Sequence, residues 1–115
     1  MEIRGEKALV LGAGRSGIAS ARFLAEHGAI VALHDTKDIE AWTEAARSLK
    51  ESHNVGLISG QLPSWLLDQI GLVVISPGVP TNTIPARYVD RKDGLVIGEI
   101  ELAYRFLKGR IVGIT

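Results

Sequence analysis

The sequence lacks cysteine, and it has no excess of either charge sign, since 13 lysines and arginines balance 13 aspartates and glutamates. Without cysteine, disulfides, thiolate nucleophiles and zinc–thiolate sites are excluded. A net charge of zero gives no basis for nucleic-acid binding by charge attraction, and no cluster of Lys and Arg marks a membrane-binding patch. We therefore expect neither a nucleic-acid nor a membrane partner.

Long apolar runs and targeting segments are absent as well. No apolar run is long enough to span a bilayer, and the chain does not open with a charged segment followed by an apolar stretch, as a secretory signal would. With 115 residues, of which 46% are hydrophobic, the chain is suited to one compact domain with a real core. We expect a cytoplasmic monomer.

A glycine-rich turn near the N-terminus is the most informative stretch, within KALVLGAGRSG at Lys7–Gly17. A short apolar run leads into glycines spaced G-x-G-x-x-G, and a helical pattern follows at once. In a phosphate-binding turn, Gly12 permits the tight bend, Gly14 lets phosphates approach the backbone, and Gly17 lets the helix pack close to the strand. The helix N-terminus then offers N–H groups and a positive dipole end to a diphosphate. Glycines also serve ordinary turns, but this context favours phosphate binding.

Apolar periodicity predicts that strands and helices alternate along the chain. This alternation implies right-handed crossovers and the strand order 3-2-1-4-5. The sequence therefore predicts a Rossmann-like, three-layer α/β/α domain with a five-stranded, mostly parallel sheet. We expect strands at residues 7–11, 29–34, 55–59, 72–75, 95–97 and 111–114, and helices from about residue 16 to Gly28 and at residues 39–52, 63–69, 86–92 and 99–107.

Several local details follow from residue types. Ser16 is placed to cap the first helix, and Gly28 is placed to end it. Trp42 is expected to pack against the protein rather than to stack on a ligand. In the short helix at 63–69, Trp65 is expected to point inward.

Three motifs follow predicted strands that are neighbours in the sheet. Ligands of parallel sheets bind outside the carboxyl ends of the strands, at the switch point between strands 1 and 4. Because strands 2, 1 and 4 lie side by side, the motifs should line one crevice. The candidate binding residues are Gly14, Arg15, Ser16 and Gly17 after strand 1, Asp35, Thr36 and Lys37 after strand 2, and Ser76, Pro77 and Gly78 after strand 4.

These residues have structural explanations too. Asp35 fits a turn or a helix cap, but an acid there can also accept hydrogen bonds from a ribose hydroxyl or a base N–H, which favours a ligand role. Arg15 can meet phosphate or solvent. Pro77 ends a strand, and Gly78 either permits a positive φ or lets a ligand pass close to bare backbone.

No catalytic or metal-binding set is predicted in this chain. His27, His34 and His53 are scattered without ligand spacing and are expected to be structural. Glu99 and Glu101 are expected in the first turn of a helix, where carboxylates suit the dipole, and they point to different sides. There is no Ser/His/Asp set, no acidic metal cluster and no GxxxxGK[ST] phosphate loop. The chain is therefore predicted to be a binding domain.

With these residues in place, the chain resembles the N-terminal domain of the Mur ligases. The matching stretches are LGAGRSGIASARFLAEHGAIVALHD, ISPGVP, IGEIELAYRF and IVGIT, in the family's order over nearly the whole chain. SPG followed at this distance by GEIEL is much more specific than G-x-G-x-x-G. The chain is most similar to the members that add D-glutamate to UDP-N-acetylmuramoyl-L-alanine in peptidoglycan biosynthesis.

The resemblance implies that this domain holds the UDP part of a nucleotide-sugar peptide. Residues 15–17 would meet the diphosphate, residues 35–37 the uridine, and residues 76–78 the nucleotide-sugar. Lys37 keeps the charge, though not the guanidinium, of the basic residue usual at its position. Arg15 stands where other members often carry an apolar residue.

The family's reaction is ATP-dependent amide formation, in which the substrate carboxylate is phosphorylated and then attacked by the amino group of D-glutamate. The resemblance implies that ATP, Mg²⁺ and D-glutamate bind to central and C-terminal domains, so this chain would hold no cofactor and be inactive alone. It also implies that residues 1–98 form the UDP-binding domain. Residues 99–115 would begin the central domain, with IVGIT leading into the ATP phosphate loop.

Three other interpretations stay open. An NAD(P)- or FAD-binding domain of an oxidoreductase uses the same turn and acid, although it needs neither SPG nor GEIEL. Another Mur ligase, adding a different residue, usually has a differently shaped glycine turn. A non-catalytic nucleotide-sensing module would lack a GTxGKT-type loop after Thr115.

Overall fold

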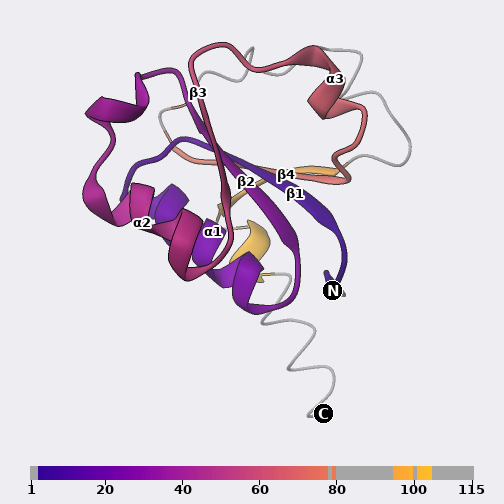
Figure 1. The fold of residues 1–115 in the computed structure, drawn as a ribbon. Helices are drawn as coiled ribbons and strands as arrows, with labels where there is room; N and C mark the ends of the chain where they lie inside the picture. The colour runs from indigo at the N-terminus through magenta and orange to yellow at the C-terminus, as the bar shows by residue number, and fades with distance from the viewer. Residues whose placement is uncertain (1–2, 78, 80–94, 100, 105–115) are drawn as a thin grey trace, which may run out of the picture.

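A computed structural model of the chain describes residues 3–77, 79, 95–99 and 101–104 (Figure 1). The predicted helix at 86–92 and strand at 111–114 lie outside the described residues. Residues 99 and 101–104 are helical. The other elements are β1 (Lys7–Leu11), α1 (Arg15–Glu26), β2 (Ile30–Asp35), the 3-10 helix η1 (Ile39–Ala41), α2 (Glu44–Ser52), β3 (Gly56–Ser59), α3 (Ser64–Leu67), β4 (Leu72–Ile75) and β5 (Leu95–Gly98).

The five strands form one sheet in the order β3-β2-β1-β4-β5, and every neighbouring pair is parallel. This confirms the predicted order, with a sheet that is parallel throughout. β1 lies at the centre, between β2 and β4. The switch point, where consecutive strands stop being added on one side and continue on the other, therefore lies between β1 and β4.

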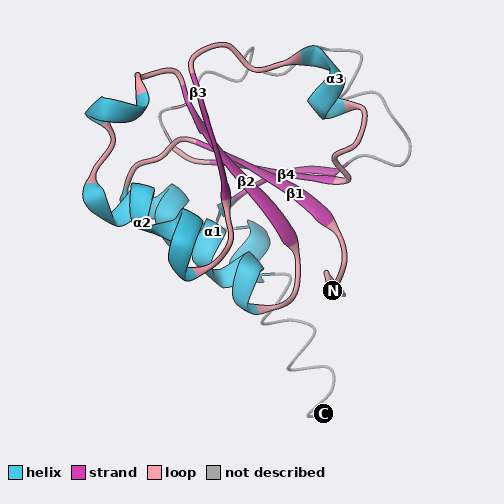
Figure 2. Cartoon of the chain, viewed as in Figure 1, coloured by secondary structure: helices cyan, strands magenta, loops and turns pink. Residues whose placement is uncertain are grey.

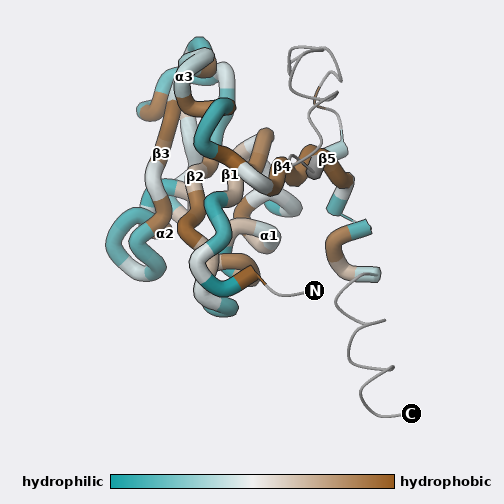
Figure 3. Tube along the Cα trace, turned by 90° about the vertical axis from the view of Figure 1, so that its right-hand side faces the viewer, coloured by the Kyte–Doolittle hydropathy of each residue, from teal (hydrophilic) through white to brown (hydrophobic). Residues whose placement is uncertain are grey.

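Side chains of β1 alternate between the two faces of the sheet. Ala8 and Val10 belong to a core shared with α1 and α2, whereas Leu9 and Leu11 belong to a second core shared with α3. All four side chains are fully buried. Figure 2 shows α1 and α2 together on one face and α3 on the other, and Figure 3 shows the strands as mostly hydrophobic. The predicted three-layer architecture is confirmed.

The ends of α1 agree with the predictions only in part. Gly28 ends the helix as predicted: it has a φ of +92°, and the N–H of Ala29 donates back to the carbonyl of Leu24 at 3.0 Å. The predicted cap by Ser16 is wrong. The helix begins one residue earlier, with Gly14 at the N-cap and no side-chain cap bond, which places Ser16 inside the first turn.

The predicted helix at 39–52 is wrong in its first part. Trp42 adopts an extended conformation between η1 and α2, and the hydroxyl of Thr43 caps α2 by accepting from the N–H of Ala46 at 3.3 Å. The buried indole of Trp42 donates to the carbonyl of Lys37 at 3.0 Å. Trp42 is thus a packing residue as predicted, and α2 begins only after Trp42 and its N-cap residue Thr43.

The inward orientation predicted for Trp65 is also wrong, since its exposed fraction is 61%. The helix is shorter than predicted, and α3 makes a single turn. One turn offers few positions to the sheet, and Leu67 in α3 and Ile70 just after it are the residues that pack there. Trp65 is left on the outer side.

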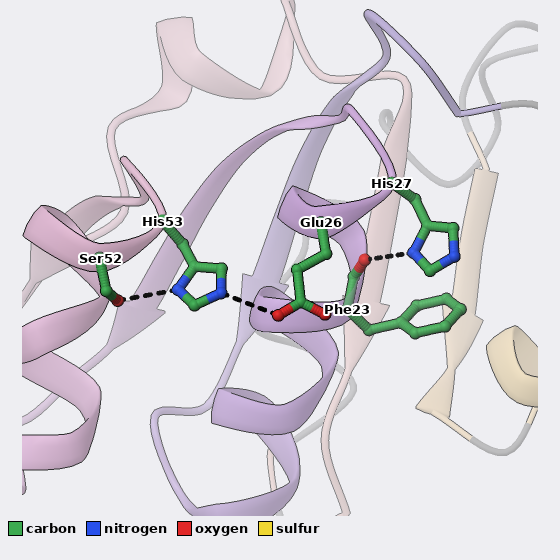
Figure 4. A network of polar contacts seen from close by, with 5 residues as sticks. All are labelled: Phe23, Glu26, His27, Ser52 and His53. Atoms are coloured by element: carbon green, nitrogen blue, oxygen red, sulfur yellow. Dashed lines mark hydrogen bonds and ion pairs between the residues drawn. The ribbon is translucent and has the colours of Figure 1, made fainter.

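A polar link joins the C-terminal ends of α1 and α2 (Figure 4). Nε2 of His53 lies 3.0 Å from Oε2 of Glu26, and Nδ1 of the same ring shares a hydrogen bond of 2.8 Å with Oγ of Ser52. Nδ1 of His27 lies 2.7 Å from the carbonyl oxygen of Phe23. Both histidines therefore have the structural role predicted for them.

We expect Glu26→Gln to lower the free energy of unfolding by no more than about 1 kcal/mol, because polar and charged contacts between exposed side chains are screened by water. The side chain of Glu26 is 53% exposed. Urea denaturation at neutral pH measures the difference. Glu51→Gln, at an exposed position of α2, is the control and should change little. A loss of several kcal/mol in Glu26→Gln would contradict this expectation and show that the contact between Glu26 and His53 contributes strongly to the stability of the fold.

Candidate functional site

The three predicted motifs meet at one edge of the sheet, because β1, β2 and β4 are parallel neighbours and end there together. Two backbone hydrogen bonds continue the strand pairing into the motifs. The N–H of Gly12 donates to the carbonyl of His34 at 2.7 Å, and the N–H of Ser76 donates to the carbonyl of Leu11 at 3.1 Å. The glycine turn is thus fixed to the strands on both of its sides.

The glycine turn is tightly packed at two of its glycines and open at the third. Gly12 has a φ of +103°, which favours glycine. A Cβ on Gly17 would lie 1.7 Å from the carbonyl oxygen of Gly12, so α1 begins directly against the turn. At Gly14, a Cβ would meet no atom within 4 Å. Only Gly14 therefore leaves room for a ligand beside its backbone.

The N-terminus of α1 has the polarity of an anion site. Its first turn contains no acidic residue, and Gly14 at the N-cap has no side chain that could accept a hydrogen bond from the first N–H groups of the helix. The N–H of Ile18 donates to the carbonyl of Gly14 at 2.9 Å, so the N–H groups of Arg15, Ser16 and Gly17 have no acceptor within the helix. These groups and the helix dipole favour a negatively charged partner.

Ser76 has a buried hydroxyl that lacks a partner. The residue is 7% exposed, and its Oγ makes no hydrogen bond to the described part of the chain. This Oγ lies 3.1 Å and 3.2 Å from the points where a Cβ on Gly17 and on Gly12 would stand, so it rests against the glycine turn. A buried polar atom without a partner is uncommon in folded proteins and calls for an explanation.

Asp35 is bound to backbone on both sides. Its Oδ2 accepts a hydrogen bond from the N–H of Ala13 at 2.9 Å, and its Oδ1 accepts one from the N–H of Lys37 at 3.0 Å. The bond to Lys37 is the local turn considered from the sequence. The bond to Ala13 was not predicted, because a donor in the backbone has no signal in residue type.

The net effect of these surroundings is a lowered pKa for Asp35. Burial is the largest influence on this pKa and raises it, but it is outweighed. The backbone hydrogen bonds from Lys37 and Ala13, followed by the charges of Lys37 and His34, lower the pKa below its ordinary value of 3.8. The carboxylate is therefore ionised at neutral pH.

The remaining predicted binding residues lie at the surface or outside the described residues. Thr36, Lys37, Arg15 and Pro77 are exposed, and Gly78 is not among the described residues. The side chain of Arg15 lines a groove of about 390 Å³ between α1 and the start of α2. It is thus on the side of α1 that faces α2.

Two further titratable residues end up near this edge. Nε2 of the buried His34 lies 2.7 Å from the carbonyl oxygen of Gly60, which confirms a structural role. Glu99 is helical as predicted, but its Oε1 is buried without a hydrogen-bond partner in the described segments, beside a groove of about 240 Å³ that Phe23 also lines. Within those segments, no group of three or more His, Asp or Glu side chains could hold a metal ion.

The parallel sheet, its strand order and the glycine turn define a Rossmann-like α/β domain. Residues 6–98 match the family described as Mur ligase MurD-like, N-terminal domain. The chain belongs to this family.

Curated relatives agree with the family match over the whole chain. A protein of Caldicellulosiruptor bescii is 44% identical over 120 residues, and one of Lachnoclostridium phytofermentans is 38% identical over 115 residues. Both are named UDP-N-acetylmuramoylalanine–D-glutamate ligase, and in both cases 100% of this chain and 25% of the relative is covered. The chain thus spans about a quarter of the length of these relatives.

Solved structures with a similar fold include dehydrogenases. Shikimate dehydrogenase from Aquifex aeolicus has a TM-score of 0.62 at 22% identity, covering 84% of this chain and 35% of that one. SirC, a precorrin-2 dehydrogenase, has a TM-score of 0.63 at 12% identity, covering 84% of this chain and 45% of that one. At such low identity the similarity supports the Rossmann-like fold alone.

None of the helices in the described ranges combines the length and apolar character that a bilayer-crossing helix needs.

We expect Gly17→Ala and Gly14→Ala to differ strongly in stability. The methyl group of Gly17→Ala would lie 1.7 Å from a backbone oxygen, so α1 has to move away from β1, at a cost of about 3 kcal/mol or more. Gly14 has φ −78° and ψ −173°, which alanine adopts easily, and its substitution should cost less than about 1 kcal/mol. Urea denaturation compares the two, and equal losses would contradict the close packing at Gly17.

The lowered pKa of Asp35 predicts a stabilisation that disappears in acid. Because the folded chain holds the proton of Asp35 less tightly than the unfolded chain, the contribution is fully present above the ordinary pKa of 3.8 and is lost as the pH falls through the lower folded pKa. Wild type should therefore be more stable than Asp35→Asn at neutral pH, with the difference shrinking below about pH 4. Denaturant unfolding at a series of pH values measures it. A difference that does not change with pH would argue against the charged hydrogen bonds.

Proposed function

We propose that this chain is the nucleotide-sugar-binding part of a ligase that joins D-glutamate to UDP-N-acetylmuramoyl-L-alanine in peptidoglycan biosynthesis. The observation that carries the proposal is the hydroxyl of Ser76, buried without a partner against the glycine turn. It stands beside a helix N-terminus that has no acidic residue and no side-chain cap. The family membership and the names of the relatives support a UDP-linked ligand.

The diphosphate is proposed to lie over the open backbone of Gly14. There its oxygens would accept hydrogen bonds from the N–H groups of residues 15–17, which have no acceptor within the helix. The hydroxyl of Ser76 would donate a further hydrogen bond, so that ligand binding would give this buried group its partner. A negative ligand fits this position because the first turn of α1 presents no acid to repel it.

The nucleoside is proposed to lie toward the end of β2. Asp35 can accept from a ribose hydroxyl or a base N–H through the lone pairs that its two backbone bonds leave over. Thr36 and Lys37 are exposed beside it. The sugar would extend past Ser76 toward Pro77 and Gly78.

The chemical step is proposed to take place with parts of the full-length protein outside this chain. The chain contains no GxxxxGK[ST] loop for the phosphates of ATP, and it spans about a quarter of its relatives. ATP, Mg²⁺ and D-glutamate would bind to those other parts, with residues 1–98 forming the UDP-binding domain and residues 99–115 beginning the next. The role of this chain is then to hold the substrate, and alone it would be inactive.

Calorimetric titration with UDP-N-acetylmuramoyl-L-alanine, UDP and NAD in parallel tests the proposal. We expect heat from the two UDP ligands and none from NAD. Ser76→Ala should weaken UDP binding about tenfold, because a hydrogen bond to a charged group contributes about 1.5–3 kcal/mol. Ser48→Ala, an exposed serine on α2, is the matched control and should bind UDP like wild type. Heat from NAD and none from UDP would instead indicate an oxidoreductase domain.

A further inference from the structure

The carboxylate of Asp35 connects two segments that are distant in the sequence. It holds the N–H of Ala13, 22 residues earlier, at 2.9 Å, and the N–H of Lys37 at 3.0 Å. Ala13 stands between the first two glycines of the turn and is only 7% exposed. A single side chain thus fixes both the glycine turn and the loop after β2.

The charge of Asp35 is the wrong one for a direct contact with phosphate. A carboxylate near a diphosphate repels it, and the first turn of α1 contains no acidic residue. The two N–H groups explain why a carboxylate is nevertheless present, since charge-assisted hydrogen bonds to backbone N–H are strong and offset the cost of partial burial. The oxygens already have these partners without any ligand.

We infer that Asp35 is a positioning residue, whose carboxylate holds the glycine turn in the shape that the diphosphate requires. This inference rests on the proposed diphosphate site. The N–H of Gly12 is held by the carbonyl of His34 at 2.7 Å, and Asp35 adds the next N–H along the chain. Without that second anchor, Gly14 and its neighbours gain conformational freedom, and the ligand has to order the turn as it binds.

Asparagine at position 35 separates the two hydrogen bonds. Its amide has a single acceptor oxygen, so only one of the two N–H groups can keep its partner, and the other then faces an NH₂ donor with which it cannot pair. Because Lys37 is only two residues away in the local turn, we expect the oxygen to stay with Lys37, and Asp35→Asn then removes the long-range bond with little change in size. Asp38→Asn is the matched control, because it removes the same charge from an exposed side chain that makes no cap bond.

The test uses two partial ligands and an NMR-detected titration of the 115-residue chain. Inorganic diphosphate has no ribose or base for Asp35 to contact, and uridine has no phosphate. We expect Asp35→Asn to bind inorganic diphosphate about tenfold more weakly, although it removes a negative charge. Asp38→Asn should bind it equally well or slightly better. If Asp35→Asn binds diphosphate as well as wild type and loses only uridine, the inference is wrong and Asp35 is a nucleoside contact.

Hydrogen exchange at the amide of Ala13 provides a second readout that needs no ligand. We expect exchange to be faster in Asp35→Asn than in wild type by about tenfold or more, and unchanged in Asp38→Asn. Equal exchange in Asp35→Asn and wild type would overturn the inference. Failure of the wild-type chain to bind either partial ligand would count against the proposed function, while the exchange rates would still decide the role of Asp35.

A second variant covers the case in which Asp35→Asn does not fold, as judged by circular dichroism. Asp35→Glu keeps the charge but moves the carboxylate by one methylene, so it cannot hold both N–H groups in the same geometry. We expect weaker diphosphate binding and faster exchange at Ala13 here too. Wild-type behaviour of Asp35→Glu in both measurements would contradict a positioning role.

Discussion

The contact between the first turn of α1 and the end of β1 determines where everything else at this edge can lie. Gly17 stands so close to the carbonyl oxygen of Gly12 that a single methyl group would not fit. This contact brings the positive end of the helix to the switch point of the sheet, where the crevice of such folds opens. Because neither of these two glycines has a side chain, the side chain of Ser76 can pack directly against them. A displaced helix would therefore change both the N–H groups and the position of the hydroxyl.

The parallel sheet explains how few side chains are needed to build this site. Because β1 is central and buried on both faces, its end is surrounded by the ends of β2 and β4. Backbone groups make most of the contacts there, including those of Gly12 with His34 and of Ser76 with Leu11. Only Asp35 and Ser76 contribute buried or partly buried polar side chains from the three motifs. The shape of the site thus follows from strand order and glycine placement.

The fold could be predicted from the sequence because it depends on patterns that repeat. Apolar runs such as 8–11 and 72–75 mark buried parallel strands, and five strands in alternation with helices leave few possible topologies. The failures concern single side chains. Trp42 lies in an extended break before α2, where its indole donates to the carbonyl of Lys37, and Trp65 is exposed on α3, which is one turn long. Neither the reach of a ring nor the length of a short helix can be taken from periodicity.

The candidate site, too, could be predicted in part from sequence patterns and in part not. Its location could be predicted, because the carboxyl ends of parallel neighbours must meet, and the glycine spacing indicates which strand carries the turn. The bond from Ala13 to Asp35 could not be predicted, because its donor is a backbone group that every residue except proline possesses. The identity of the ligand cannot come from the fold either, since dehydrogenases share it. The ligand has to be distinguished by polar groups that this chain adds to the shared fold. One such group is the buried hydroxyl of Ser76, which lacks a hydrogen-bond partner within the described chain. A dinucleotide-binding turn needs only the glycines, the helix and the acid, whereas the SPG strand end adds a donor on the opposite side of the turn from Asp35.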